Sequence, residues 1–149
     1  MFGFIYELAD GLRHHARRRK WPAEHALGRR GEDIAHRYLQ RAGMVVVARN
    51  YRSAGGAEEI DLVGWDHGTL VFVEVKSRST EDYGSPDRAI DPIKQQHMIR
   101  AARRYARHAE APWETVRFDV VTVIFGAPPE VTHYKDVFKP ARPVFQDRP

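Results

Sequence analysis

The residues with the clearest capacity for chemistry are Asp61, Glu74 and Lys76, which lie in two short segments of alternating polarity. Asp61 belongs to residues 59–65, and twelve residues separate it from Glu74 in the Glu-x-Lys sequence of residues 70–76. Mg²⁺ is often held by one or two carboxylates, with waters and phosphates completing its shell. A nearby lysine can stabilise developing charge or position an attacking water. The pattern indicates a divalent-metal site for phosphate chemistry.

The two segments are expected to form a β-hairpin, because Gly68 gives a turn signal between them. A two-residue loop (67–68) and a four-residue loop (66–69) give the same register, whereas a three-residue loop would change it. In that register Asp61 lies directly opposite Glu74. Two carboxylates placed so close repel each other, and a bound cation gives a reason for the pairing.

The same register places Glu59 opposite Lys76, on the face that carries Asp61 and Glu74. An alternative reading is an exposed strand face on which Glu59 and Lys76 form a cross-strand ion pair of little energetic value. The other face is apolar and is predicted to be the core face, with Ile60, Leu62, Val71, Val73 and Val75.

The remaining elements follow from periodicity and from Gly and Pro signals. One helix is predicted over residues 22–42, before Gly43, and a second runs from the Asp91-Pro92 start to about residue 108. The other expected segments are strands at 44–48, 116–125 and 131–138, a turn at 53–57 and a loop at 78–90. This order predicts an α/β fold with a mixed sheet and helices packed on it.

Composition favours one domain in a reducing compartment. The chain has 149 residues and no cysteine, which excludes a disulfide scaffold, a cysteine zinc site and a cysteine nucleophile. Lysine and arginine exceed aspartate and glutamate by 24 to 20, so an anionic partner is plausible. No apolar stretch is long enough for a membrane span and no signal peptide is recognised, so a cytoplasmic protein is expected. The expected parts are a basic arm at 1–21, a domain at 22–138 and a Pro/Arg tail at 139–149.

Several short motifs occur in one order: Gly31-Glu32-Asp33-Ile34-Ala35, Arg49-Asn50-Tyr51-Arg52, Glu59-Ile60-Asp61-Leu62-Val63, and residues 71–78 with Lys94 after them. Over roughly residues 26–125 the chain resembles the YraN-like family of small bacterial proteins. The resemblance implies a restriction-endonuclease-like, PD-(D/E)xK fold: three layers, with a mixed central sheet flanked by helices. Archaeal Holliday-junction resolvases are similar.

The resemblance also implies a site. Glu32 joins Asp61 and Glu74 as metal ligands for Mg²⁺ or Mn²⁺, the backbone carbonyl of Val75 completes the shell, and Lys76 is the catalytic lysine. One position departs from the family pattern, since Glu58 stands where a glycine is expected. Its negative charge is expected to change metal affinity or the approach of DNA.

The sequence leaves two interpretations open for each of two candidate site residues, Glu32 and Lys94. Glu32 borders the helix face that turns to the sheet, so it either joins the metal site or pairs along its helix with Arg29 or His36. Lys94 heads the apolar stripe of the second helix, so it either points to the site or a phosphate, or is exposed beside Asp91.

Further basic residues are candidates for phosphate contacts. Arg100 and Arg104 lie on the outer side of the second helix, where a solvated face is the ordinary alternative. Arg52 and Arg78 flank the two acidic segments. Gln95 and Glu59 are expected to have supporting roles.

These inferences lead to a divalent-metal-dependent nuclease that hydrolyses DNA, with branched or junction DNA suggested by analogy with resolvases. The same analogy allows a homodimer, although no motif specifies one. The main rival is a non-catalytic nucleic-acid-binding or adaptor protein that retains the fold. A second rival is a partner-binding protein whose arm, residues 2–12, docks on another protein or on a membrane.

Overall fold

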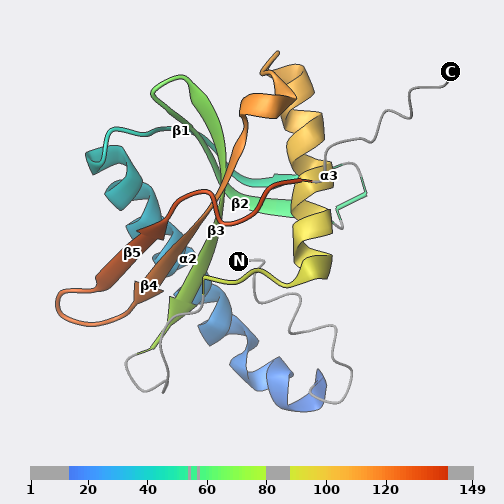
Figure 1. Ribbon diagram of the computed structural model, residues 1–149. Helices are drawn as coiled ribbons and strands as arrows, with labels where there is room; N and C mark the ends of the chain where they lie inside the picture. Colours follow the sequence, from blue (N-terminus) through green and yellow to red (C-terminus); the bar gives the residue numbers. More distant parts are fainter. Residues whose placement is uncertain (1–13, 54, 57, 80–87, 141–149) are drawn as a thin grey trace, which may run out of the picture.

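Five strands form one mixed sheet in the order β1-β2-β3-β4-β5 (Figure 1). The computed structural model describes residues 14–53, 55–56, 58–79 and 88–140, with side chains from residue 26 onward. Neighbouring strands are antiparallel except β3 and β4, which are parallel and joined by a connection that contains a helix. The strands are β1 (Val45–Arg52), β2 (Glu59–Asp66), β3 (Thr69–Arg78), β4 (Arg117–Ile124) and β5 (Glu130–Tyr134). The predicted α/β class with a mixed sheet is confirmed.

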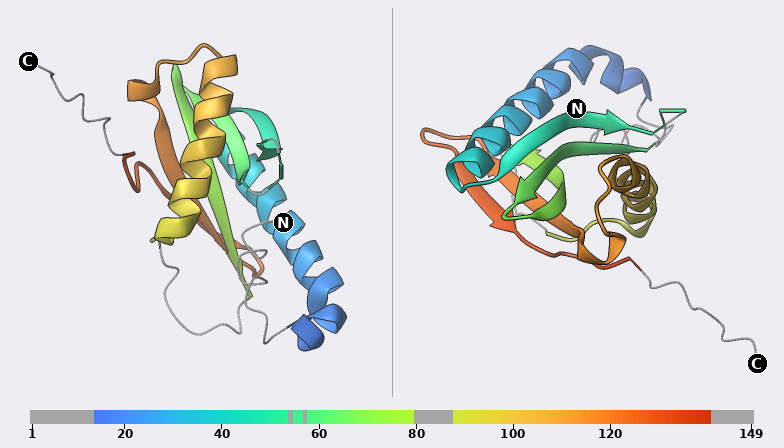
Figure 2. Two further views of the ribbon diagram at one scale, coloured as in Figure 1. Left: turned by 90° about the vertical axis from the view of Figure 1, so that its right-hand side faces the viewer. Right: turned by 90° about the horizontal axis from the view of Figure 1, so that it is seen from above.

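The two long helices cover opposite faces of the sheet, α2 (His14–Arg41) on one and α3 (Pro92–His108) on the other (Figure 2). A short 3-10 helix, η2 (Trp113–Thr115), lies between α3 and β4. Each helix encloses its own apolar cluster against the sheet. The cluster under α3 includes Phe72, Met98 and Phe118, and the cluster under α2 includes Leu39, Val73 and Val121. Among the described helices, none is long and apolar enough to cross a membrane.

Local signals explain where α3 begins and where α2 ends. Asp91 caps α3, since its side chain accepts hydrogen bonds from the backbone N–H groups of Ile93 (2.7 Å) and Lys94 (3.4 Å), and Pro92 follows at the first helical position. Gly43 has a φ of 96° after α2, where the backbone N–H of Met44 bonds back to the carbonyl of Leu39 at 2.9 Å. Both ends agree with the predicted boundaries.

Several predicted boundaries are wrong. The first helix begins at His14 rather than 22, because the alanine and basic residues before Pro22 favour helix and Pro22 does not interrupt it. The first strand, predicted over 44–48, is Val45–Arg52, since pairing with β2 extends it through polar residues. β5 ends at Tyr134 rather than 138, because the N–H of Val137 bonds to the carbonyl of Phe118 (2.8 Å) and leaves the ladder. The loop predicted over 78–90 starts later, because Arg78 still belongs to β3. Residues 79 and 88–90 are outside helix and strand as predicted, and residues 80–87 lie outside the described part.

Candidate functional site

A two-residue turn sets the register of the hairpin that carries the acids. His67 and Gly68 both have positive φ, 48° and 86°, which is the geometry of a type I′ turn matched to the twist of the strands. The ladder then pairs Asp66 with Thr69 and continues to Leu62 opposite Val73. This is the predicted register as far as the pair Leu62–Val73, which comes directly before Asp61 and Glu74.

The two strands separate where the acids begin. The described ladder of β2 and β3 ends at the pair Leu62–Val73. Beyond this pair, the backbone N–H of Val75 donates a hydrogen bond to Oδ2 of Asp61 at 2.8 Å. A side-chain acceptor thus stands in the place of a backbone carbonyl of β2. The carboxylate therefore lies in the opening between the strands, a feature that alternation along the sequence does not predict.

The acids are enclosed by the helices, which corrects the reading of an exposed strand face. Glu32 and Asp61 are each 1% exposed, Glu59 is 2% exposed and Glu74 is 5% exposed. The predicted core face is right for Leu62, Val71, Val73 and Val75, which pack in the cluster under α2, but wrong for Ile60, which packs in the cluster under α3. Ile60 lies beyond the end of the β2–β3 ladder and stays paired with Tyr51 of β1, which packs against the cluster under α3.

Lys94 points into this site. Its side chain is 7% exposed, and Nζ lies 3.3 Å from Oε2 of Glu74 and 3.4 Å from the backbone carbonyl of Glu59. The alternative of an exposed lysine beside Asp91 is therefore wrong. A buried ammonium in this position balances part of the charge of the carboxylates that surround it.

Glu32 approaches the same site from α2. Two partners within the described residues come from β1: Oε2 lies 3.7 Å from Nη2 of Arg49, and Asn50 donates a side-chain hydrogen bond to the carboxylate. Burial, and then the charge of Asp61, raise the pKa of Glu32. The influence of Asp61 on this pKa indicates that the two carboxylates are close enough to interact.

The electrostatics of the site favour an added positive charge. Burial, and then the charge of Asp61, raise the pKa of Glu59 to about 8. Burial and the neighbouring Glu74 also raise the pKa of Asp61, while Lys94 and the N–H of Val75 act in the opposite direction. Several carboxylates in a poorly solvated space stay ionised only with a counter-charge.

The donor set fits a hard cation in part. Oδ1 of Asp61 and both Oε atoms of Glu59 are buried and have no hydrogen-bond partner among the described residues. Such oxygens suit Mg²⁺ or Mn²⁺. Over the described part of the chain, however, no three His, Asp or Glu side chains form a ready-made cage. A bound ion would have two protein carboxylates as direct ligands, and water and phosphate oxygens would complete its coordination shell.

Lys76 lies beside the acids, at an intermediate exposure, and its ammonium donates to the backbone carbonyl of Ala89 just before α3. The carboxylate of Glu59 instead lies near Arg52, at 3.6 Å from Nε, so the pairing predicted for these two residues is replaced by other contacts. Arg52 therefore joins the edge of the site.

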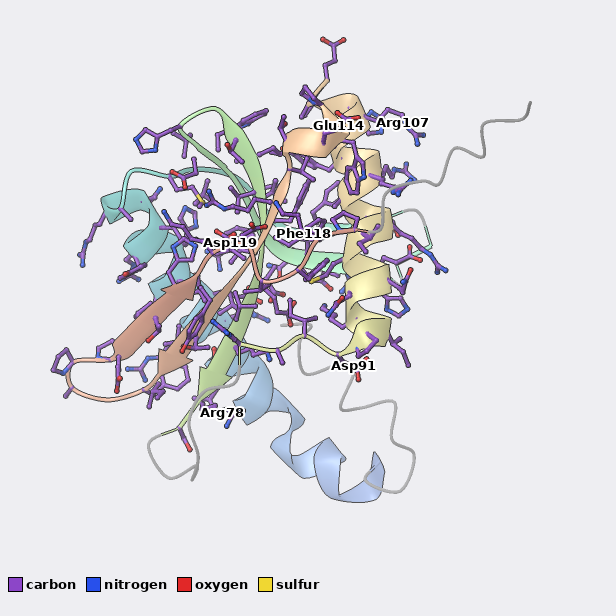
Figure 3. All side chains as sticks on the ribbon, in the orientation of Figure 1. Arg78, Asp91, Arg107, Glu114, Phe118 and Asp119 are labelled. Atoms are coloured by element: carbon purple, nitrogen blue, oxygen red, sulfur yellow. The ribbon has the colours of Figure 1, made fainter. Side chains whose placement is uncertain are left out.

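The remaining candidates lie further out. Arg100 lies 3.5 Å from Glu58, which also accepts a hydrogen bond from Ser53, so these residues tie the β1–β2 turn to α3. The amide of Gln95 donates to the carbonyl of Ile90 at 2.9 Å and holds the chain at the start of α3. Two other basic candidates have no contact with these acids among the described residues: Arg104 is exposed on α3, and Arg78 is the last residue of β3 (Figure 3).

Two features were missed from the sequence. Gly31 brings α2 against β3, since a Cβ there would lie 1.7 Å from Oγ of Ser77, and this close contact seats Glu32. Arg49 also holds Asp33 at 2.7 Å and so fixes the same turn of α2. Gly31 and Arg49 belong to the Gly31-Glu32-Asp33 and Arg49-Asn50 motifs. The distance between the two motifs along the sequence does not show that they are in contact.

Comparison with known proteins gives one consistent family. A family profile described as "Uncharacterised protein family UPF0102" matches residues 31–123. A UPF0102 protein of Solibacter usitatus (strain Ellin6076) is 50% identical over 138 residues, 93% of this chain and 100% of the relative. One from Koribacter versatilis (strain Ellin345) is 42% identical over 112 residues, 74% and 78% of the two chains. One from Rhodococcus jostii (strain RHA1) is 44% identical over 115 residues, 76% and 96%.

Proposed function

Because this chain belongs to the uncharacterised protein family UPF0102, we propose its function from its site: a divalent-metal-dependent nuclease that hydrolyses phosphodiester bonds in DNA. Membership confirms the resemblance to the YraN-like family. The restriction-endonuclease-like fold and the likeness to Holliday-junction resolvases belong to the proposal, as do a cytoplasmic location, a DNA partner and a homodimer.

One observation carries the proposal: four buried carboxylates from α2, β2 and β3 surround the point where β2 and β3 separate. Carboxylates cluster in a low-dielectric space at a large cost unless a cation accompanies them. Lys94 supplies one positive charge, which leaves the group acidic. A stable fold that retains this arrangement is typical of a site that binds a cation for chemistry.

Asp61 and Glu74 would hold Mg²⁺ or Mn²⁺ directly, with the backbone carbonyl of Val75 in the same shell, and Glu32 would contact the ion through one of its waters. A bound divalent ion lowers the pKa of its water and neutralises charge on a phosphate. The N–H of Val75 orients Asp61, and Lys94 keeps Glu74 in place. Lys76, two residues after Glu74 on β3, would use its ammonium to orient the attacking water or stabilise charge on the phosphate.

The test is metal binding and DNA cleavage by the wild type and by Asp61→Asn. Mn²⁺ binding is measured by calorimetry, and cleavage on labelled linear, flap and four-way DNA. We expect Asp61→Asn to lose both. Glu114→Gln is the matched control, because Glu114 is an exposed acid at the other end of α3 from Asp91 (Figure 3). Cleavage that persists in Asp61→Asn would contradict the proposal.

A non-catalytic nucleic-acid-binding or adaptor role is the second candidate. The observation that favours it is the ion pair of Lys94 with Glu74, which stabilises the site without a metal. That role predicts DNA binding in the presence of a chelator, with neither Mn²⁺ binding nor cleavage of any of the three substrates.

A further inference from the structure

A hollow of about 420 Å³ lies between the second half of α2 and the β4–β5 turn, away from the carboxylates. Its apolar side consists of Ile34 and Tyr38 on α2, and Pro129 and Val131 on the other wall. We refer to it as the α2–β5 groove. Figures 1 and 2 show that this part of α2 and the β4–β5 turn are side by side. Its volume falls in the range of ligand sites, ~300–1,000 Å³.

Two arginines border this groove without a carboxylate to neutralise them. Arg37 and Arg41 are exposed, and neither forms an ion pair with any residue that the structure describes. Arg49, Arg100 and Arg117 each lie beside an acid. Residues four apart on a helix lie on one side, separated by ~6 Å along the axis. The groove thus presents two guanidinium groups in one line.

An aromatic ring lies beside these charges. Tyr38 is 38% exposed and lines both this hollow and a second one of about 240 Å³, which extends toward His133 and Lys135. Pro128 and Pro129 form the facing wall. A flat ring flanked by prolines is suited to stacking a nucleobase, and planar guanidinium groups bind phosphate bidentately.

We propose that the α2–β5 groove binds a single-stranded segment of nucleic acid, with phosphates on Arg37 and Arg41 and a base against Tyr38. Bases within a duplex are stacked on one another, so only an unpaired base can reach the ring. The inference rests on the proposed function and narrows its substrate class to nucleic acids with an unpaired strand, such as flaps and branches.

The groove and the proposed active site share α2. Glu32 faces the β1 side of this helix, whereas Arg37 and Arg41 face the β5 side. Along the axis they lie only ~8 Å and ~14 Å from Glu32, the rise of five and nine residues. A substrate with one part in the site and an unpaired strand on the other side of α2 would contact both. This proximity favours a nucleic acid over an acidic peptide as the occupant.

The experiment measures fluorescence anisotropy of a labelled oligothymidylate with the full chain in EDTA, over a series of salt concentrations. For Arg37→Gln/Arg41→Gln we expect at least tenfold weaker binding at low salt. The slope of log K against log salt should fall by ~1.4, the value for two lost phosphate contacts on a single strand. The control Arg29→Gln/Lys139→Gln removes two exposed cations outside the groove. Its slope should differ from the wild-type slope by less than a third of the change expected for the groove variant.

Variants of Tyr38 distinguish the contribution of base stacking to binding from that of charge. Tyr38→Ala should weaken binding about fivefold or more, the effect of losing one stacked base, and Tyr38→Phe should restore it. An oligonucleotide carrying 4-thiothymidine should crosslink to the peptide that contains Tyr38. Equal losses in the groove variant and the control variant would overturn the proposal. Competition by polyglutamate as effective as that by unlabelled oligonucleotide would also overturn it, in favour of an acidic peptide.

The assay distinguishes this inference from the nuclease proposal because it needs neither metal nor turnover. Binding that depends on Arg37 and Arg41 in a protein that cleaves no substrate would support the groove and contradict the nuclease. Cleavage that depends on Asp61, with binding unaffected by the groove variant, would support the nuclease and overturn the groove.

Discussion

The residue with the greatest influence on the site is Lys94, because it is the buried cation beside Glu74 and Glu59. Its ammonium lies 3.3 Å from Oε2 of Glu74. Removing one partner of a buried pair leaves the other charge uncompensated, which is far more costly than losing a surface pair. The stability of the metal-free protein should therefore depend on this side chain.

Lys94→Met is expected to lower the free energy of unfolding in EDTA by about 3 kcal/mol, since it leaves Glu74 buried without its counter-charge. The measurement is urea denaturation. Adding Glu74→Gln should recover part of the loss, because the charge to be balanced is removed. The control Lys135→Met removes a lysine that is 60% exposed beside Asp66, and should cost less than about 1 kcal/mol. Equal effects of the two lysines would contradict this account.

A second buried charge network, on β4 and β5, gives a prediction for pH. Asp119 is 0% exposed and lies 2.7 Å from Nε2 of His133 and 2.9 Å from Nε of Arg117. Burial raises the pKa of Asp119, but the hydrogen bonds from His133 and Arg117 outweigh it and hold the pKa below its usual value. Its contribution to stability is therefore complete above pH ~4, the ordinary value, and is lost as pH falls through the lower folded value.

Asp119→Asn should accordingly be less stable than the wild type at neutral pH by about 3 kcal/mol, because Arg117 loses a buried partner. The difference should shrink below pH ~4, as the wild-type carboxylate becomes protonated. Urea denaturation at a series of pH values checks both statements. A difference that stays constant down to pH ~2 would show that the charge of Asp119 does not provide the stability.

At the scale of elements, the contact of α2 with β3 decides where Glu32 lies. Gly31 allows the approach, since a Cβ would lie 1.7 Å from Oγ and 2.8 Å from Cβ of Ser77. Any larger residue must displace the helix or the strand. The glycine is therefore required for packing, and indirectly for the position of the neighbouring carboxylate.

Gly31→Ala should destabilise the protein by about 1–3 kcal/mol and weaken Mn²⁺ binding, because α2 moves away from β3 and takes Glu32 with it. Thermal denaturation and calorimetry measure the two effects. Ser77→Ala in the same chain should recover part of both, since it removes the nearer of the two clashing atoms. Arg29→Ala is the comparison, at an exposed position two residues earlier on the same helix. Loss of stability without any loss of Mn²⁺ affinity would mean that Gly31 is needed for packing but not for the position of Glu32.

The sequence was most informative where turn chemistry and alternation agree. The turn at His67-Gly68 predicted the hairpin register, which the structure has from Asp66–Thr69 to Leu62–Val73. Alternation could not predict that β2 and β3 separate at Asp61, because this depends on a side chain bonding to the N–H of Val75. For the same reason Ile60 was assigned to the wrong side. The contacts of Lys94 and Arg49 depend on how α3 and β1 pack, which local patterns leave open.

At the scale of the whole molecule, the candidate site lies where three layers meet: α2, the strand opening and α3. A ligand there would join elements from both faces of the sheet. Binding to the folded state alone stabilises it by about 2.7 kcal/mol at a ligand concentration of 100 times Kd. For a chain of this size that energy corresponds to an increase of about 5–10 °C in Tm.

Saturating Mn²⁺ should therefore raise the Tm of the wild type by about 5–10 °C and leave the Tm of Asp61→Asn nearly unchanged. Differential scanning calorimetry with and without EDTA is the measurement. Glu114→Gln should respond like the wild type, because Glu114 is exposed and lies at the other end of α3 from Asp91 (Figure 3). An equal rise in Asp61→Asn would mean that the metal binds elsewhere.

The parallel pairing of β3 and β4 has a consequence for the order of folding. β2 and β3 are joined by a two-residue turn, so their hairpin can form on the microsecond scale, ~1–10 μs. β4 can join only after the long connection through α3 closes, and non-local pairing of this kind is slow. Asp61 and Glu74 directly follow the last pair of this ladder, so they come near each other early, in water, where their repulsion is weak. They become enclosed only when α3 arrives, and α3 carries Lys94 with it.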